Sequence, residues 1–200
     1  MDLDECIQTR KSIRKFTDQK VDDKLIGEII KAGIRAPSGG NFQPWYFVVV
    51  QKEEVIENMR KVILEKYLEF YGKDSINSNV SYRVKKYGLL FNAKTVISVC
   101  VDLSKTYLNS FCINELDKLL DSIEVISVGA CIENMLLKIH DLGLGACWCR
   151  VAHFSRQALE KLLDIKPPYF LIANIAIGYP AEKKETTPRK DIDSIYRIVN

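Results

Sequence analysis

Residues 125–151 read VISVGACIENMLLKIHDLGLGACWCRV, and this stretch decides the fold. It completes a helical pattern over residues 115–142 that is closed by Gly143, and residues 145–151 then have the pattern of a strand. Over residues 125–137 the sequence is apolar nearly all round, so the predicted helix has no clear polar face. Such a helix is buried on several sides, and in a chain this small a partner subunit is a natural source of the second cover.

On both sides of this stretch the chain alternates between predicted helices and short predicted strands. Helical spacing of apolar residues predicts helices over residues 4–10, from 22 to before Pro37, over 53–71 and over 155–163, with Asp22 and Ser155 as N-caps. Aromatic and β-branched runs predict strands over residues 45–50, 95–101 and 169–177. Together these elements predict one three-layer α+β domain over residues 1–200.

Composition and charge exclude several classes of protein. Of the 200 residues, 47% are hydrophobic and 28% are charged, close to the globular average, which excludes disordered and fibrous chains. The net charge of +3 comes without a block of basic residues, so no nucleic-acid partner is expected.

The expected location is the cytoplasm, with no association with membranes. The start of the chain, MDLDECIQTRKSIRKF, lacks the apolar run of a secretory signal. The most apolar stretch carries Glu133, Lys138, His140 and Asp141, which are too costly for a membrane span. The six cysteines are too dilute for a disulfide framework, so reduced thiols are expected.

The first motif with chemical potential is Arg10-Lys11-Ser12-Ile13-Arg14, in a segment predicted to be extended. Side chains at positions 10, 12 and 14 of an extended segment point to the same side. Two guanidinium groups and a hydroxyl there suit a phosphate dianion. Taken alone, the motif is more often an ordinary solvated basic turn.

The second motif is the loop APSGGNFQPW over residues 36–45. Its two glycines let a backbone approach a flat ligand closely, and its Ser, Asn and Gln side chains offer donors and acceptors to a heterocycle. The alternative is a plain helix-to-strand connection.

The third motif is LGLGACWCR over residues 142–150. The chain has neither the GxGxxG of a dinucleotide domain nor the GxxxxGK[ST] of a P-loop. With two histidines and no second cysteine pair nearby, no metal site is expected. Cys149 could act as a nucleophile with His153, but a core cysteine is the favoured interpretation because buried thiols behave as small hydrophobes.

The fourth motif is the tail TTPRK at residues 186–190. A charged tail is usually solvated surface. It would gain a role if it folded back to give a second cation to a phosphate held by Arg10 and Arg14.

These motifs, in this order, resemble the FMN-dependent nitroreductase family along nearly the whole chain. The resemblance rests on RKSIRKF at residues 10–16, APSGGNFQPWYFVVV at 36–50, the apolar helix with LGLGACW, IGYP at 177–180 and PRK at 188–190. It implies a homodimer of α/β/α sandwiches with a central, mainly antiparallel sheet and two FMN molecules at the subunit interface.

The resemblance also assigns cofactor-binding residues, and it implies no metal and no acid–base catalytic side chain. The residues implied to bind the phosphate and ribityl chain are Arg10, Lys11, Ser12 and Arg14, with Lys11 near the polar edge of the flavin and Arg189 as the second phosphate cation. Those of the loop that reaches the flavin of the neighbouring subunit are Pro37, Ser38, Gly39 and Asn41. Those passing the ring, largely through backbone groups, are Trp148, Cys149 and Arg150.

The implied reaction is a ping-pong cycle in which NADH or NADPH reduces the flavin and a small molecule, such as a nitroaromatic or a quinone, then takes the electrons. The chain departs from the family at Arg150, where many members have a small or uncharged residue, and at Thr187, where some have a second lysine. The alternatives are a reductive dehalogenase or flavin-cleaving enzyme of the same fold, a non-catalytic FMN-binding or sensing protein, and a cofactor-free structural dimer.

Overall fold

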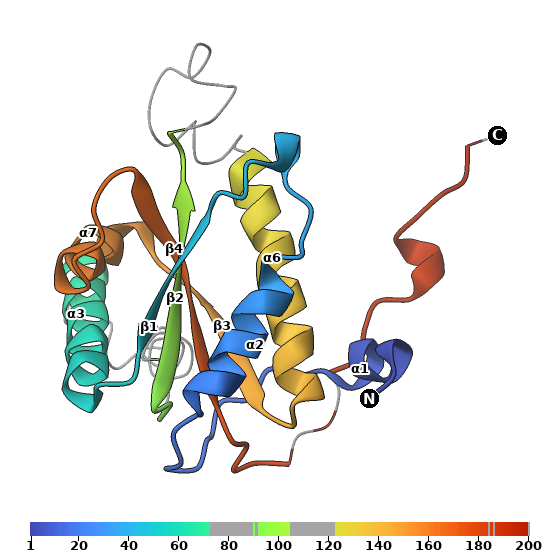
Figure 1. Cartoon of the computed structure of the whole chain (residues 1–200), viewed down its shortest axis with the longest axis horizontal. Helices are drawn as coiled ribbons and strands as arrows, with labels where there is room; N and C mark the ends of the chain where they lie inside the picture. Colours follow the sequence, from blue (N-terminus) through green and yellow to red (C-terminus); the bar gives the residue numbers. More distant parts are fainter. Residues whose placement is uncertain (73–89, 91, 105–122, 184, 186, 200) are drawn as a thin grey trace.

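In the described part of the chain, the centre of the molecule is a four-stranded antiparallel sheet with the strand order β1-β2-β4-β3 (Figure 1). The computed structural model describes residues 1–72, 90, 92–104, 123–183, 185 and 187–199. The strands are β1 (Trp45–Val50), β2 (Thr95–Asp102), β3 (Gly145–Arg150) and β4 (Tyr169–Gly178). Strand β4 pairs with β2 on one side and with β3 on the other, and helices on the two faces of the sheet bury most of its length.

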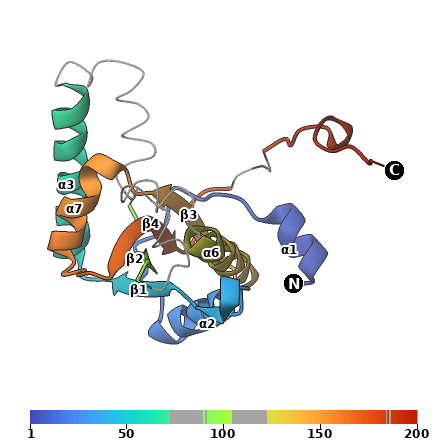
Figure 2. The same ribbon diagram turned by 90° about the horizontal axis from the view of Figure 1, so that it is seen from above.

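Helices cover both faces of this sheet (Figure 2). On one face lie α2 (Asp23–Gly33) and α6 (Ile123–Asp141), and on the other lie α3 (Glu53–Tyr71) and α7 (His153–Leu162). A short helix, α1 (Leu3–Thr9), lies beside α6. The expected three-layer α/β/α sandwich with a mainly antiparallel sheet is therefore confirmed.

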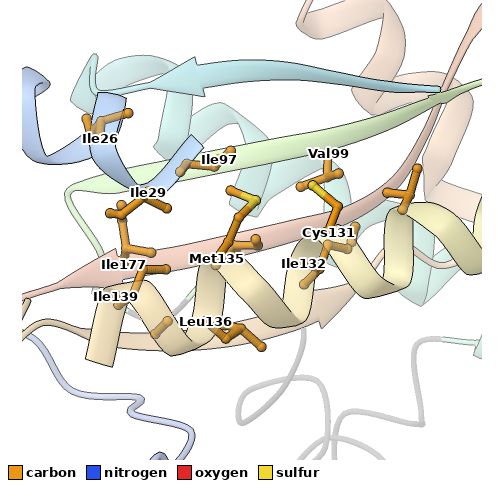
Figure 3. Close-up of a cluster of buried hydrophobic side chains, with 14 of the residues drawn as sticks. Ile26, Ile29, Ile97, Val99, Cys131, Ile132, Met135, Leu136, Ile139 and Ile177 are labelled. Carbon is orange, nitrogen blue, oxygen red and sulfur yellow. The ribbon is translucent and has the colours of Figure 1, made fainter. Parts of the chain in front are cut away.

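The larger core lies between the sheet and the α2/α6 layer (Figure 3). Ile29 on α2 and Met135 and Ile139 on α6 are fully buried against β2 and β4. The two helices approach closely at Gly33, where an added Cβ would lie 2.6 Å from Met135 Cγ. The small residue is therefore a condition for this helix packing.

Local sequence signals explain some of the helix bounds, whereas others differ from the prediction. The Asp22 side chain caps α2 by accepting a hydrogen bond from Lys24 N at 2.7 Å, as expected. The expected start of the long helix at residue 115 lies outside the described residues, and the described part begins at Ile123. The prediction that Ser155 caps the last helix is wrong: α7 begins two residues earlier, and Ser155 Oγ donates to Ala152 O from inside the helix.

The segment of residues 10–16 runs along the outer edge of β3, as its predicted extended form requires. Ile13 N donates to Ala146 O at 2.8 Å, and Phe16 forms an isolated bridge with Pro180 in the IGYP turn. Glu182 accepts from Arg14 N at 2.7 Å and from Lys15 N at 3.2 Å. Motifs that are far apart in sequence thus meet at this edge of the sheet.

None of the described helices has the length and apolar character needed to cross a bilayer.

Candidate functional site

A cavity of about 370 Å³ opens where β3 meets the α3/α7 layer. Residues from the segment 10–16, β3, β4, α3 and α7 line it, so all the elements around this corner of the sheet contribute. Four predicted site residues are among its lining: Arg14, Trp148, Cys149 and Arg150. The structure therefore brings together the first and third sequence motifs.

Side chains on the two faces of strand β3 differ in their burial. Cys147 and Cys149 are buried on the α3/α7 side, whereas Trp148 and Arg150 point to the opposite face and are exposed, Trp148 by 44%. The backbone between them borders the cavity. A planar ligand in the cavity would meet this backbone, and the role of residues 148–150 toward such a ligand stays a prediction.

The Cys149 thiol has the properties of a core group. Hydrogen bonding with Cys147, followed by burial, raises the pKa of Cys149 well above its ordinary value, while the Arg14 guanidinium acts in the opposite direction. The His153 ring packs against Phe70 and Phe154, and over the described ranges no contact joins it to Cys149. A protonated thiol is a poor nucleophile, which favours the core-cysteine interpretation over a Cys–His pair.

Sequence reasoning missed Asn174, which lies on β4 and also borders the cavity. It is 2% exposed, and its Oδ1 accepts a hydrogen bond of 2.7 Å from Ser98 Oγ on β2. Ser98, Asn174 and Cys149 are paired across β2, β4 and β3 at the same level of the sheet. The available signal was a single Asn inside the apolar strand YFLIANIAIG.

Aromatic side chains from α3 and α7 form a second feature that the sequence did not single out. Tyr67, Tyr71 and Phe154 line the cavity. Tyr67 lies 4.6 Å from Tyr71 between ring centroids, and Phe154 stacks on Phe70 at 4.8 Å. Together they give the cavity an apolar wall that faces the polar groups Arg14 and Asn174.

The other residues of the first motif lie outside this cavity. Arg10 caps α1 and forms an ion pair with Glu133 on α6, with Nε 3.1 Å from Oε1. Lys11 borders a second cavity of about 440 Å³, which also contacts His140 and Lys183. Ser12 forms the isolated bridge with Ala146.

The predicted loop residues Pro37, Ser38, Gly39 and Asn41 lie against the start of α6. Gly39 N donates to Ser127 Oγ at 3.4 Å, and an added Cβ at Gly39 would lie 2.8 Å from Ile123. Gly40 and Asn41 both have a φ of 56°, a left-handed conformation that favours Gly and Asn. The loop does not line the 370 Å³ cavity of its own chain.

Arg189 is exposed in the C-terminal segment, which leads away from the sheet and helices in both views (Figures 1 and 2). Its Nη1 donates to Thr187 O at 3.2 Å. Within this chain the tail therefore does not fold back onto Arg10 and Arg14.

Comparison with known proteins gives consistent matches over the whole chain. The sequence pattern of the nitroreductase family matches residues 7–179. A protein of Archaeoglobus fulgidus, which carries the provisional name NADH dehydrogenase/NAD(P)H nitroreductase, is 30% identical with 98% of both chains covered. Iodotyrosine deiodinase 1 of Sus scrofa is 28% identical, covering 96% of this chain and 66% of the deiodinase.

Solved structures agree with these sequence matches. A BluB-like flavoprotein of Clostridium difficile 630 superposes with a TM-score of 0.84 at 28% identity, covering all of both chains. A nitroreductase with bound FMN from Desulfitobacterium hafniense DCB-2 has a TM-score of 0.74 at 20% identity, with 98% of this chain and 97% of that chain covered.

Proposed function

Because the chain belongs to the nitroreductase family, we propose that it is an FMN-dependent oxidoreductase that passes electrons from NADH or NADPH to a small-molecule acceptor, such as a nitroaromatic or a quinone. The observation that carries this proposal is the cavity beside β3, where Arg14 meets the strand-end residues Trp148, Cys149 and Arg150. The names of the relatives support it, since they include NAD(P)H nitroreductases and a flavoprotein.

The groups around the cavity fit a flavin. Isoalloxazine has an apolar ring body and a polar edge of carbonyl and ring-nitrogen acceptors. The cavity has an aromatic wall with Tyr67 and Phe154, and it has donors on Arg14 and Asn174. Such a division between apolar and polar groups suits a planar amphipathic ligand.

Bound FMN supplies the redox chemistry by accepting two electrons from the nicotinamide and releasing them to the acceptor. The chain orients it and stabilises negative charge. The Arg14 cation beside the cavity would favour an anionic ligand state, and backbone groups of residues 148–151, which border the cavity, would lie against the ring. We assign no acid–base role to any side chain.

For the phosphate we retain the predicted cations Arg10 and Arg189, with Lys11 and Ser12 beside them. Among the described residues Arg10 pairs only with Glu133, through Nε, so in that part of the chain its other guanidinium donors can serve a ligand. The C-terminal tail that carries Arg189 leads away from the rest of its own chain, so Arg189 would reach the phosphate of an FMN bound by the other subunit.

The proposed assembly is a homodimer, with Pro37, Ser38, Gly39 and Asn41 reaching the FMN bound by the other subunit. Ile126 on α6 is 72% exposed although it lies in an apolar helix. The C-terminal segment exposes five more large apolar side chains, Ile192, Ile195, Tyr196, Ile198 and Val199. Apolar surface of this extent is typical of an interface.

The first test is the visible spectrum of the purified protein, followed by anaerobic addition of NADH and NADPH. A yellow protein that bleaches and then recovers its colour with a nitroaromatic or quinone supports the proposal. A yellow protein that no nicotinamide bleaches would point to FMN binding without reductase turnover, and a colourless protein that cannot take up FMN would refute FMN dependence.

Reductive dehalogenation is a second candidate, favoured by the similarity to iodotyrosine deiodinase 1. The same spectral assay separates the two when an iodinated phenol replaces the nitroaromatic. Release of iodide on reoxidation would favour the dehalogenase, whereas reoxidation by quinones alone would favour the reductase.

A further inference from the structure

A buried carboxamide in the sheet faces the cavity without a full set of partners. Over the described residues, the only hydrogen bond of the Asn174 side chain is the one that Oδ1 accepts from Ser98 Oγ at 2.7 Å. The two N–H groups of Nδ2 therefore have no protein partner in that part of the chain. Asn174 is only 2% exposed and lines the cavity, so the cavity is where this donor can meet a ligand or a water.

The neighbours of Asn174 fix the direction in which this amide points. Ser98 lies on β2, on one side of β4, and Cys149 lies on β3, on the other side. Since Oδ1 is turned toward Ser98, Nδ2 is directed toward β3 and the cavity that Asn174 lines. Ser98 is itself fully buried, so its hydroxyl holds the carboxamide in one orientation.

Two hydrogen-bond donors thus line the same cavity, the neutral carboxamide of Asn174 and the charged guanidinium of Arg14. Arg14 lines it from the segment at the edge of β3, and Asn174 lines it from the middle of the sheet. Most of the remaining side chains in its lining are apolar or aromatic, among them Ile63, Leu90 and Leu159. A ligand that satisfies these groups has an apolar body and an acceptor-rich edge.

We propose that Asn174 is a flavin-binding residue that donates from Nδ2 to a carbonyl or ring-nitrogen acceptor on the polar edge of FMN, and that Ser98 is the positioning residue that aims it. This inference rests on the proposed function, because it takes FMN as the ligand of the cavity. A neutral donor at that edge stabilises the extra negative charge of the reduced cofactor more than the oxidised form.

The test compares FMN binding by the full-length wild-type protein with that of Asn174→Ala, Ser98→Ala and the double variant. The apoprotein is titrated with FMN, and flavin fluorescence quenching gives Kd. Asn174→Ala should bind FMN about tenfold more weakly, on the scale of one lost hydrogen bond. If the variant's affinity for reduced FMN falls by about ten times more than its affinity for oxidised FMN, the two-electron midpoint potential of the bound flavin falls by about 30 mV.

The double variant separates a ligand contact from a structural role. If Asn174 only satisfies the buried Ser98 hydroxyl, removing both groups restores wild-type affinity and potential. If Nδ2 contacts FMN, the double variant stays as weak as Asn174→Ala. Cys100→Ala is the matched control, because Cys100 is fully buried on β2, two residues from Ser98, and does not line the cavity. It should leave both quantities unchanged.

The outcomes distinguish failure of this inference from failure of the proposed function. Wild-type affinity and potential in Asn174→Ala, or their recovery in the double variant, would overturn the inference while leaving FMN dependence intact. A wild-type protein that does not bind FMN would overturn both. If the variants do not fold, the unchanged protein still answers: FMN should shift the assigned side-chain amide signals of Asn174 in ¹⁵N NMR spectra, and unshifted signals would refute the contact.

Discussion

At the scale of single residues, Arg14 connects the first motif to the cavity. Glu182 holds its backbone N–H at 2.7 Å, and its side chain lines the cavity beside Cys149. Arg14→Ala should weaken FMN binding by about 2 kcal/mol, or roughly thirtyfold, the scale for losing a charged hydrogen-bond partner. Titration of apoprotein with FMN measures this change.

Lys15→Ala is the matched control for Arg14→Ala. Lys15 follows Arg14 directly, and its backbone N–H is held by the same glutamate, but its side chain is exposed. It should keep wild-type affinity. Equal losses in both variants would show that general positive charge, and not the placement of Arg14, attracts the cofactor.

A second prediction at this scale concerns His140 on α6, whose Nε2 lies 2.8 Å from Thr9 Oγ1 on α1. Burial, followed by the nearby Lys11 and Arg10 cations, lowers the pKa of His140 below its ordinary value near 6.5. The unfolded chain therefore binds a proton more readily than the folded chain, and this contribution to stability is lost as the pH falls below about 6.5.

Urea unfolding at pH 7.5 and 5.5 measures that contribution. His140→Gln should lose less unfolding free energy between the two pH values than the wild-type protein does. His153→Gln, which removes the other histidine of the chain, controls for imidazole loss elsewhere. An unchanged pH dependence in His140→Gln would contradict the prediction.

At the scale of elements, α2 offers two glycines with opposite surroundings. An added Cβ at Gly33 would clash with Met135 of α6, whereas at Gly27 it would meet nothing within 4 Å. Gly33→Ala should lower the free energy of unfolding by about 1–3 kcal/mol through overpacking. Gly27→Ala should raise it by about 0.5–1 kcal/mol, because alanine loses less backbone freedom in a helix.

Chemical denaturation of both variants tests this prediction. Because both substitutions lie on α2, each variant serves as the control for the other. Destabilisation by both substitutions would indicate that α2 tolerates no added bulk at all. Stabilisation by both would show that α6 moves aside at the crossing.

The elements were also the part of the fold that the sequence predicted best. An aromatic and β-branched run predicted strand β1, and helical apolar spacing predicted helix α3, both with the bounds observed, and Asp22 marked the start of α2. Ser155 misled the prediction because a serine hydroxyl can bond backward inside a first turn as well as cap it.

The candidate site was only partly predictable, for a physical reason. Motifs with unusual polar residues, such as those containing Arg14 and Arg150, stand out in sequence. Tyr67 and Phe154 read as ordinary amphipathic-helix residues, and Asn174 acquires meaning only when Ser98 is known to lie beside it. Pairing between strands is not a local property.

At the scale of the whole molecule, the proposed homodimer makes a prediction about mass. The protein should sediment as a particle of twice its 22.9 kDa chain mass. Ile126→Glu places a charge on an exposed apolar position of α6 and should shift the protein toward monomer, with loss of FMN. Sedimentation velocity with absorbance at the flavin band follows both effects.

Leu64→Glu is the control for Ile126→Glu. Leu64 is also an exposed large apolar residue, but it lies on α3, across the sheet from α6. It should remain a dimer with its FMN. Dimers that persist in Ile126→Glu would exclude this part of α6 from the interface.

The strand order also bears on how the chain is made. Strand β4, which joins β2 to β3, is the last of the four to be synthesised. As the polypeptide leaves the ribosome, β3 emerges before its neighbour exists, and the middle of the sheet stays open until residue 178 is released. A product terminated before Tyr169 would carry two unpaired strand edges, so incomplete chains are expected to aggregate or be degraded and not to persist as folded fragments.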